Sequence, residues 1–137
     1  HTTMALCFAI VGKTGPLYEA CEIGNHHPKD ENLISYSQFI IHSSLDMLEK
    51  NEFSTQNMYL KTIDKFNDMS ISGWITAQGI RFLLLHDGRS DDAIKNFFSD
   101  VYELYVRLLM NPFYKYDSQV LSPAFDHRVR ILARRYF

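Results

Sequence analysis

Two short and nearly uninterrupted apolar segments constrain the fold of this chain more than any other feature. Ala5–Val11 is apolar throughout, and Ile80–Leu85 contains a single charged residue. Segments this short favour strands over buried helices, and strands without polar alternation are covered on both faces of a sheet. We therefore expect a sheet in which these two strands are central, with helices on both of its faces.

The residues after the first apolar segment predict a hairpin. Gly12–Pro16 contains the glycines and proline that favour turns, and Leu17–Ile23 is expected as the second strand. Gly12-Lys13-Thr14 also resembles the end of a phosphate-binding loop. That motif requires a further glycine where Cys7 stands, and it opens a helix, whereas here a proline leads into a strand. A hairpin turn is the favoured interpretation.

Two more strands are expected, at Met58–Phe66 and Ile71–Thr76, before the strand at Ile80–Leu85. Lys61 and Lys65 lie on one face of the first of them. Lysines placed in this way protect the exposed edge of a sheet from pairing with another chain. The strand at Met58–Phe66 is therefore expected at an edge.

Three helices complete the predicted order. Leu33–Glu49 has an apolar side and a polar side, and Phe39 is an exception on the polar side. The second helix starts after Ser90 and ends before Pro112, and the third starts after Ser122; both serines are expected as N-caps. The order ββ-α-βββ-α-α predicts an α+β domain around a five-stranded, mostly antiparallel sheet.

The composition limits the class of protein. A chain of 137 residues with 46% hydrophobic residues fills one core, and we expect a single domain at residues 4–137, preceded by a three-residue remnant of protein production. The net charge of −2 lacks the basic excess typical of proteins that bind nucleic acid. No apolar run reaches the roughly 18 residues of a membrane span.

The two cysteines, Cys7 and Cys21, are expected to be free thiols. Two cysteines in a chain with an ample core are typical of a cytosolic protein, and both lie in apolar surroundings that keep a thiol unreactive. A disulfide between them is the less favoured alternative.

No set of residues predicts a catalytic, cofactor or metal site. His26 and His27 are adjacent and cannot both easily face one ion, while His42 and Asp46 lack a third ligand. His86 with the following aspartate could form part of a catalytic dyad, but a turn is the favoured interpretation. A nucleophile elbow of the G-x-S-x-G type is absent from the sequence.

Aromatic residues in the loop before the last helix are the main candidates for contact with a partner. Met110, Phe113 and Tyr114 either fold back over the last two helices, which is the favoured alternative, or form an exposed contact surface. Around the axis of the expected helix, Phe39 lies within about 20° of Asp46 on the polar side. An apolar residue on a polar side supports a second contact surface. The last helix carries four arginines against one aspartate and is expected to be a solvated face, with contact to a partner or to an acidic membrane as the less favoured alternative.

Long stretches of the chain resemble the sedlin family, whose members are small subunits of the transport protein particle (TRAPP) vesicle-tethering complex. The resemblance extends from Phe8 onward. It is carried by Asn57–Asn67, Arg81-Phe82, Leu85–Asp87, Ile94–Phe98, Asp100–Tyr102, Asn111–Tyr114, Ser122–Asp126, Phe39-Ile40, His42 and Leu45-Asp46. It implies a longin-like (SNARE-like) fold, with one helix on one face of the sheet and two on the other.

The resemblance also implies a function. Members of the family are non-catalytic adaptor subunits in endoplasmic reticulum-to-Golgi transport, in a complex that is the nucleotide-exchange factor of a Rab-family GTPase. It implies a cytoplasmic protein at the periphery of these membranes, bound there only through its complex, with other TRAPP subunits as direct partners. Asp46 matches the acidic position associated with the adaptor role.

Alternative functions remain open at this stage. The chain could be a stand-alone regulatory module of the longin type that binds SNAREs or membranes. It could also be a small enzyme or ligand-binding protein that uses His86, for which the sequence supplies no substrate.

Overall fold

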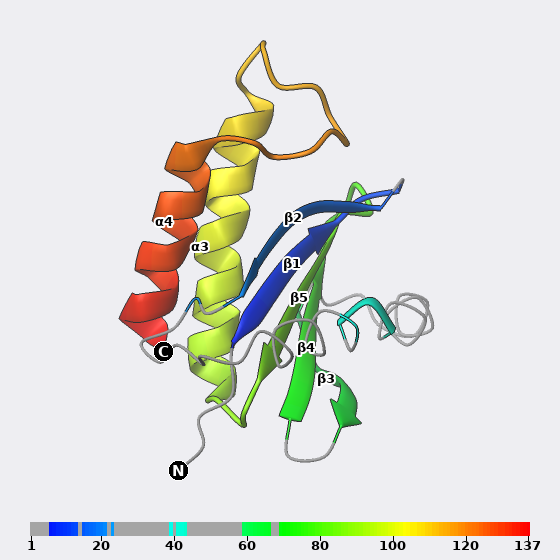
Figure 1. The fold of residues 1–137 in the computed structure, drawn as a ribbon, viewed down its shortest axis with the longest axis vertical. Coiled ribbons are helices and arrows are strands. Elements are labelled where there is room, and N and C mark those ends of the chain that lie inside the picture. The colour runs from blue at the N-terminus through cyan, green and yellow to red at the C-terminus, as the bar shows by residue number, and fades with distance from the viewer. Residues whose placement is uncertain are drawn as a thin grey trace.

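The computed structural model describes residues 6–13, 15–21, 23, 39, 41–43, 59–66 and 69–137. The described strands and helices, in chain order, are β1 (Cys7–Val11), β2 (Pro16–Cys21), β3 (Tyr59–Phe66), β4 (Met69–Ile75), β5 (Arg81–His86), α3 (Asp91–Leu109) and α4 (Pro123–Tyr136). The strands form one sheet in the order β2-β1-β5-β4-β3, and all neighbouring pairs are antiparallel (Figure 1).

The two apolar segments form the inner strands, as predicted. β5 is the central strand and pairs with β1 on one side and β4 on the other. Every residue of β1 is buried, and so is all of β5 after Arg81. β3 lies at an edge of the sheet, where Lys65 is exposed. The strand boundaries differ by one or two residues from those expected.

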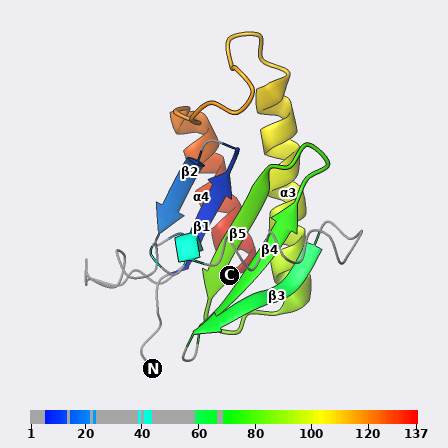
Figure 2. The same ribbon diagram turned by 90° about the vertical axis from the view of Figure 1, so that its right-hand side faces the viewer.

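Each face of the sheet has its own core. The larger core lies under α3 and α4, which cover the same face side by side (Figures 1 and 2). It includes Phe8, Phe82, Phe97, Phe98, Tyr105, Phe125 and Val129. The smaller core on the other face is formed by Cys7, Ala9, Val11, Ile41, Ile63, Met69, Ile71, Leu83 and Leu85. Ile41 brings a helical residue to this second face, so both faces are covered, as expected.

The helix starts agree with the prediction, with one difference. Ser122 is the N-cap of α4, and its hydroxyl accepts a hydrogen bond from the backbone N–H of Phe125 at 3.2 Å. Ser90 occupies the N-cap position of α3, but its side chain forms no capping hydrogen bond. Asp91 and Asp92 in the first turn still place negative charge at the positive end of the helix dipole.

The expectation of two free thiols is wrong, because Cys7 and Cys21 form a disulfide. The antiparallel register of β1 and β2 places the two residues directly opposite one another, with their Cα atoms 4.1 Å apart. This register therefore brings the two side chains together on neighbouring strands. The apolar surroundings of each thiol gave no sign of the pairing, because it depends on the register of the hairpin.

Several predictions fall outside the described residues. These are the remnant at residues 1–3, His26 and His27, Asp46, and most of the helix expected at Leu33–Glu49. Within that helix, residues 39 and 41–43 are helical, and we call them the first helical segment. Ile41 is buried, and 67% of the side chain of Phe39 is exposed, as the helical pattern predicted.

Candidate functional site

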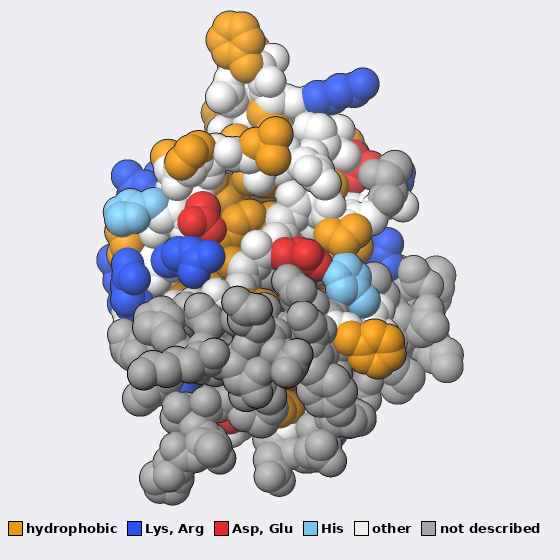
Figure 3. Space-filling model, in the orientation of Figure 1, with side chains coloured by type: hydrophobic (Ala, Val, Ile, Leu, Met, Phe, Trp, Pro, Cys, Tyr) orange, Lys and Arg blue, Asp and Glu red, His pale blue; other side chains and the backbone are white. Residues whose placement is uncertain are grey.

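Three apolar side chains are exposed at one end of the molecule. Met110 ends α3, Phe113 lies in the loop between the helices, and Leu121 precedes the N-cap of α4. Their exposed fractions are 78%, 96% and 82%. Figure 3 shows hydrophobic side chains gathered at this end, over the loop between α3 and α4. We call these three residues the apolar cap. Met110 and Phe113 are thus exposed, as the sequence analysis predicted in the less favoured of its two alternatives for this loop.

Tyr114, in contrast, folds back onto the helices, which was the favoured alternative for this loop. Its ring meets the buried ring of Tyr105 edge to face, with centroids 6.4 Å apart. Its hydroxyl donates a hydrogen bond to the backbone oxygen of Ser118 at 2.5 Å. The N–H of Phe113 donates to Oδ1 of Asn111 at 3.0 Å. The loop is therefore held by its own contacts, and it presents Phe113 from an ordered backbone.

A depression of about 430 Å³ lies beside the apolar cap. Its lining includes Leu108, Phe113, Tyr114, Gln119, Leu121 and Ser122. A second depression, of about 450 Å³, shares Gln119, Leu121 and Ser122 with the first and extends to Leu17, Tyr18 and Glu19 of β2. Exposed apolar side chains beside a hollow surface suit contact with another protein.

Leu121 was missed by the sequence analysis, although a signal was present. It occupies the position before the N-cap, where an apolar side chain often packs against the fourth residue of the helix. In α4 that fourth residue is Asp126, which offers no apolar partner. An apolar residue at this position without its helix partner is a sign of an exposed side chain.

The hairpin turn at Gly12 contacts the same loop. Oδ1 of Asp117 accepts a hydrogen bond from the backbone N–H of Lys13 at 3.0 Å, and the N–H of Gly12 donates to the oxygen of Gly15 at 2.9 Å. A carboxylate thus lies against the backbone that a phosphate-binding loop would offer to phosphate. The hairpin interpretation is confirmed.

The first helical segment carries a second exposed set of side chains. Nε2 of His42 donates a hydrogen bond to Oε1 of Glu19 on β2, and both side chains are partly exposed. Phe39 lies one turn earlier, and the hydroxyl of Ser43 donates to its backbone oxygen at 2.9 Å. The structure therefore brings Phe39 and His42 together on the side of the sheet opposite α3. Glu19 was not expected here, because only the packing of the first helical segment against β2 places it beside the histidine.

His86 has a structural role that uses both ring nitrogens. Nδ1 accepts hydrogen bonds from the backbone N–H groups of Gly88 and Arg89, each at 3.1 Å. Nε2 therefore carries the proton, and it lies 2.9 Å from the hydroxyl of Ser72. Burial lowers the pKa of His86 below 6.5. Asp87 accepts a hydrogen bond from Nε of Arg89 at 2.8 Å, so the pair shapes the turn before α3.

Across residues 6–13, 15–21, 23, 39, 41–43, 59–66 and 69–137, His, Cys, Asp and Glu side chains nowhere gather in a group of three or more that could hold a metal ion. The helices in the same part of the chain are too short or too polar to cross a membrane.

Comparison with known proteins identifies the family. Residues 10–135 match the family model described as Sedlin. The transport protein particle 20 kDa subunit of Schizosaccharomyces pombe is 46% identical over 131 residues, which cover 93% of this chain and 96% of that protein. The probable trafficking protein particle complex subunit 2 of Drosophila melanogaster is 39% identical over 131 residues, with 94% of each chain covered. Its counterpart of the same name in Caenorhabditis elegans is 38% identical over 137 residues, with 98% and 97% covered. This chain therefore belongs to the sedlin family.

Proposed function

We propose that this protein is a non-catalytic adaptor subunit of a TRAPP vesicle-tethering complex. The observation that carries the proposal is its membership of the sedlin family over nearly its whole length, with a fold that matches the element order of that family. Residues 4–137 act in this role as one domain. The direct partners are other subunits of the complex.

The apolar cap supports a role in assembly. Exposed apolar and aromatic side chains are enriched at the centres of protein interfaces, where partners exclude water from them. Phe113 is exposed almost completely although the backbone around it is held by hydrogen bonds. An ordered anchor of this kind loses little conformational entropy when it binds, which favours association.

The first helical segment supplies a second contact surface. Phe39 and His42 lie there, and Asp46 is four residues after His42 in the sequence. The two surfaces belong to different parts of the chain, since one lies on the α3–α4 side of the sheet and the other on the opposite side (Figure 2). Two separated surfaces are the arrangement that an adaptor between two partners needs.

The place of action follows from the complex. The protein acts in endoplasmic reticulum-to-Golgi transport, in the cytoplasm at the periphery of these membranes, and it reaches them through its partners. It contributes to Rab-family nucleotide exchange indirectly, because it supports the assembly of the complex that performs it. SNAREs are further candidate partners.

The experiment is reconstitution with purified TRAPP subunits, read by size-exclusion chromatography with light scattering. We expect Phe113→Ser or Phe39→Ala to remove a defined partner while the melting curve stays unchanged. Val106→Ser is the matched control, because Val106 is an exposed apolar residue of α3 outside the cap. Full assembly with both Phe113→Ser and Phe39→Ala would contradict the proposed surfaces, and failure of the unchanged protein to bind any subunit would contradict the adaptor function.

A further inference from the structure

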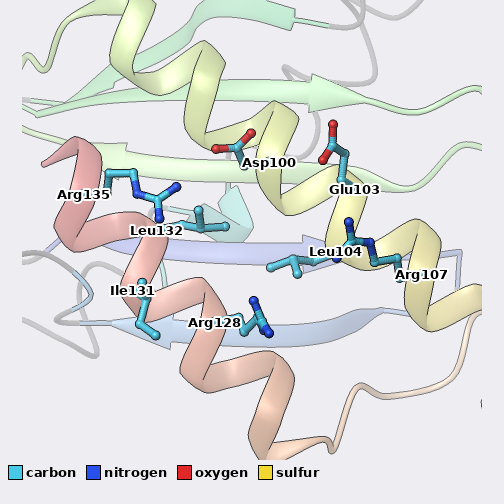
Figure 4. Close-up of a pocket in the computed structure, with 8 residues that line it drawn as sticks. All are labelled: Asp100, Glu103, Leu104, Arg107, Arg128, Ile131, Leu132 and Arg135. Atoms are coloured by element: carbon cyan, nitrogen blue, oxygen red, sulfur yellow. The ribbon is translucent and has the colours of Figure 1, made fainter.

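A groove between α3 and α4 has features that the adaptor surfaces above do not use. It has a volume of about 250 Å³ and lies on the outer side of the two helices (Figure 4). It is lined by Asp100, Glu103, Leu104 and Arg107 of α3 and by Arg128, Ile131, Leu132 and Arg135 of α4. Leu104 and Leu132 point toward one another, so the middle of the groove is apolar.

The spacing of residues on α4 explains why the α4 side of the groove is basic. Residues at intervals of three, four and seven share one face of a helix. The outer face of α4 therefore carries His127, Arg128, Ile131, Arg134 and Arg135, and all five side chains are exposed. Ile131, with 39% of its side chain exposed, lies at the centre of this basic face. Arg107 adds a further guanidinium from α3.

Charge is distributed unevenly along the groove. Asp100 and Arg135 lie toward one end, and Arg107 and Arg128 lie toward the other, where Glu103 lies beside Arg107 on α3 (Figure 4). Asp100 is already occupied, because it accepts a hydrogen bond from the hydroxyl of Tyr136 at 2.5 Å. Ion pairs between described residues join Glu19 to His42, Asp87 to Arg89 and Asp126 to Arg130, and none of these includes Arg107 or Arg128.

We propose that this groove binds an acidic segment of a partner protein. One or two apolar side chains of the segment rest on Leu104 and Leu132, and a carboxylate lies between Arg107 and Arg128. The size fits, since a cavity of about 150 Å³ already holds benzene. Arginine binds a carboxylate through two parallel hydrogen bonds, and the partly enclosed apolar floor strengthens that attraction.

The shape and the carboxylates of the groove favour a peptide over a membrane. A bilayer surface would reach the outer arginines of α4 but not the floor formed by Leu104 and Leu132. Glu103 also lines the groove, and it repels a phosphate group with two negative charges more strongly than a carboxylate with one. A peptide places its carboxylate at one end only, away from Asp100.

The test is an amide NMR titration of the full chain with a Leu-Leu-Glu-Glu-Glu peptide, beside a Leu-Leu-Lys-Lys-Lys peptide. We expect the acidic peptide to shift the signals of Leu104, Arg107, Arg128 and Leu132, and the lysine peptide to leave them unchanged. Arg128→Glu should weaken binding at least about tenfold, because it replaces attraction for the peptide carboxylate by repulsion. Arg134→Glu is the matched control, since it makes the same charge change outside the groove; it should weaken binding less than about twofold.

Three results would overturn the proposal. One is equal weakening by Arg128→Glu and Arg134→Glu, which indicates general charge attraction. The second is the absence of signal shifts in the groove. The third is a protein that does not bind the peptide but does bind vesicles of phosphatidylcholine and phosphatidylserine, with this vesicle binding lost in Arg128→Glu. That result would assign the arginines to contact with a membrane. The groove is separate from the apolar cap, so the two proposals fail independently.

Discussion

The hydroxyl of Tyr18 donates a hydrogen bond to Oδ1 of Asp126 at 2.6 Å and so joins β2 to the first turn of α4. Arg130 donates to the same carboxylate and also to the backbone oxygen of Cys21 at 3.3 Å. Burial disfavours the charged form of Asp126, but the hydrogen bonds from Tyr18 and Arg130 outweigh it and lower the pKa of this carboxyl below 3.8. Burial, aided by the bond to Asp126, raises the pKa of Tyr18.

Replacement of Tyr18 by Phe should lower the free energy of unfolding by about 1–3 kcal/mol, as expected for a hydrogen bond to a charged group. The ring would keep its edge-to-face contact with Phe125, at 5.3 Å between centroids, so little packing is lost. Urea denaturation measures the change. Tyr136→Phe is the control, because its hydroxyl bonds Asp100 near the molecular surface and should contribute less. Equal losses of unfolding free energy in the two variants would show that the hydrogen bond between β2 and α4 stabilises the fold no more than the one between Tyr136 and Asp100.

Acid should destabilise the protein through His86. Burial lowers the pKa of this histidine in the folded state below 6.5, so the unfolded chain binds the proton more readily. The free energy of unfolding should therefore fall as the pH drops from about 6.5 toward the folded-state pKa. Denaturation at several pH values tests this slope. His86→Asn should flatten it, while His127→Asn, at an exposed position of α4, should leave it unchanged. An unchanged slope in His86→Asn would assign the acid sensitivity to other groups.

Gly12→Ala should destabilise the contact between the hairpin and the helix loop. A Cβ atom at Gly12 would lie 2.0 Å from Oδ1 of Asp117, so the aspartate must move and release the N–H of Lys13. The loss should be about 1–2 kcal/mol. Asp117 has a φ of +64°, a conformation that glycine adopts readily. In a protein that already carries Asp117→Gly, the Gly12→Ala change should lower the free energy of unfolding by less. Equal losses with and without Asp117→Gly would disprove the energetic coupling between positions 12 and 117.

Reduction of the Cys7–Cys21 disulfide should lower the free energy of unfolding by about 3 kcal/mol. A cross-link that closes a loop of about 15 residues stabilises a protein by roughly this amount, because it restricts the unfolded chain. The two cysteines are 14 residues apart in sequence. Denaturation with and without a phosphine reductant measures the effect, and Cys21→Ser should be insensitive to the reductant. Alkylation of both cysteines in unfolded, unreduced protein would show that the bond is absent.

The strands and helices could be predicted because their signals are local. Uninterrupted apolar runs identified β1 and β5 as inner strands, and the serine and proline at residues 122 and 123 marked the start of α4. The helical pattern also placed Phe39 on the exposed side. Each of these features depends on residues only a few positions apart in the chain.

The parts that could not be predicted depend on pairing between distant residues. The disulfide follows from the register of β1 and β2, and composition says nothing about register. The division of the aromatic loop, with Phe113 exposed and Tyr114 packed on Tyr105, depends on the space left between α3 and α4. The groove requires Arg107 of α3 and Arg128 of α4 to line the same hollow, which no single helical pattern reveals.

The contacts of β2 also limit how a partner can bind. The oxygen of Leu17 accepts a hydrogen bond from the N–H of Val120 at 2.8 Å, and that of Cys21 accepts one from Arg130. Two acceptors on this outer strand are therefore already used within the chain. A partner that added a strand beside β2 would first have to break both bonds and detach the loop before α4. Recognition on this side must therefore use side chains, which makes it dependent on partner sequence rather than on the common geometry of the backbone.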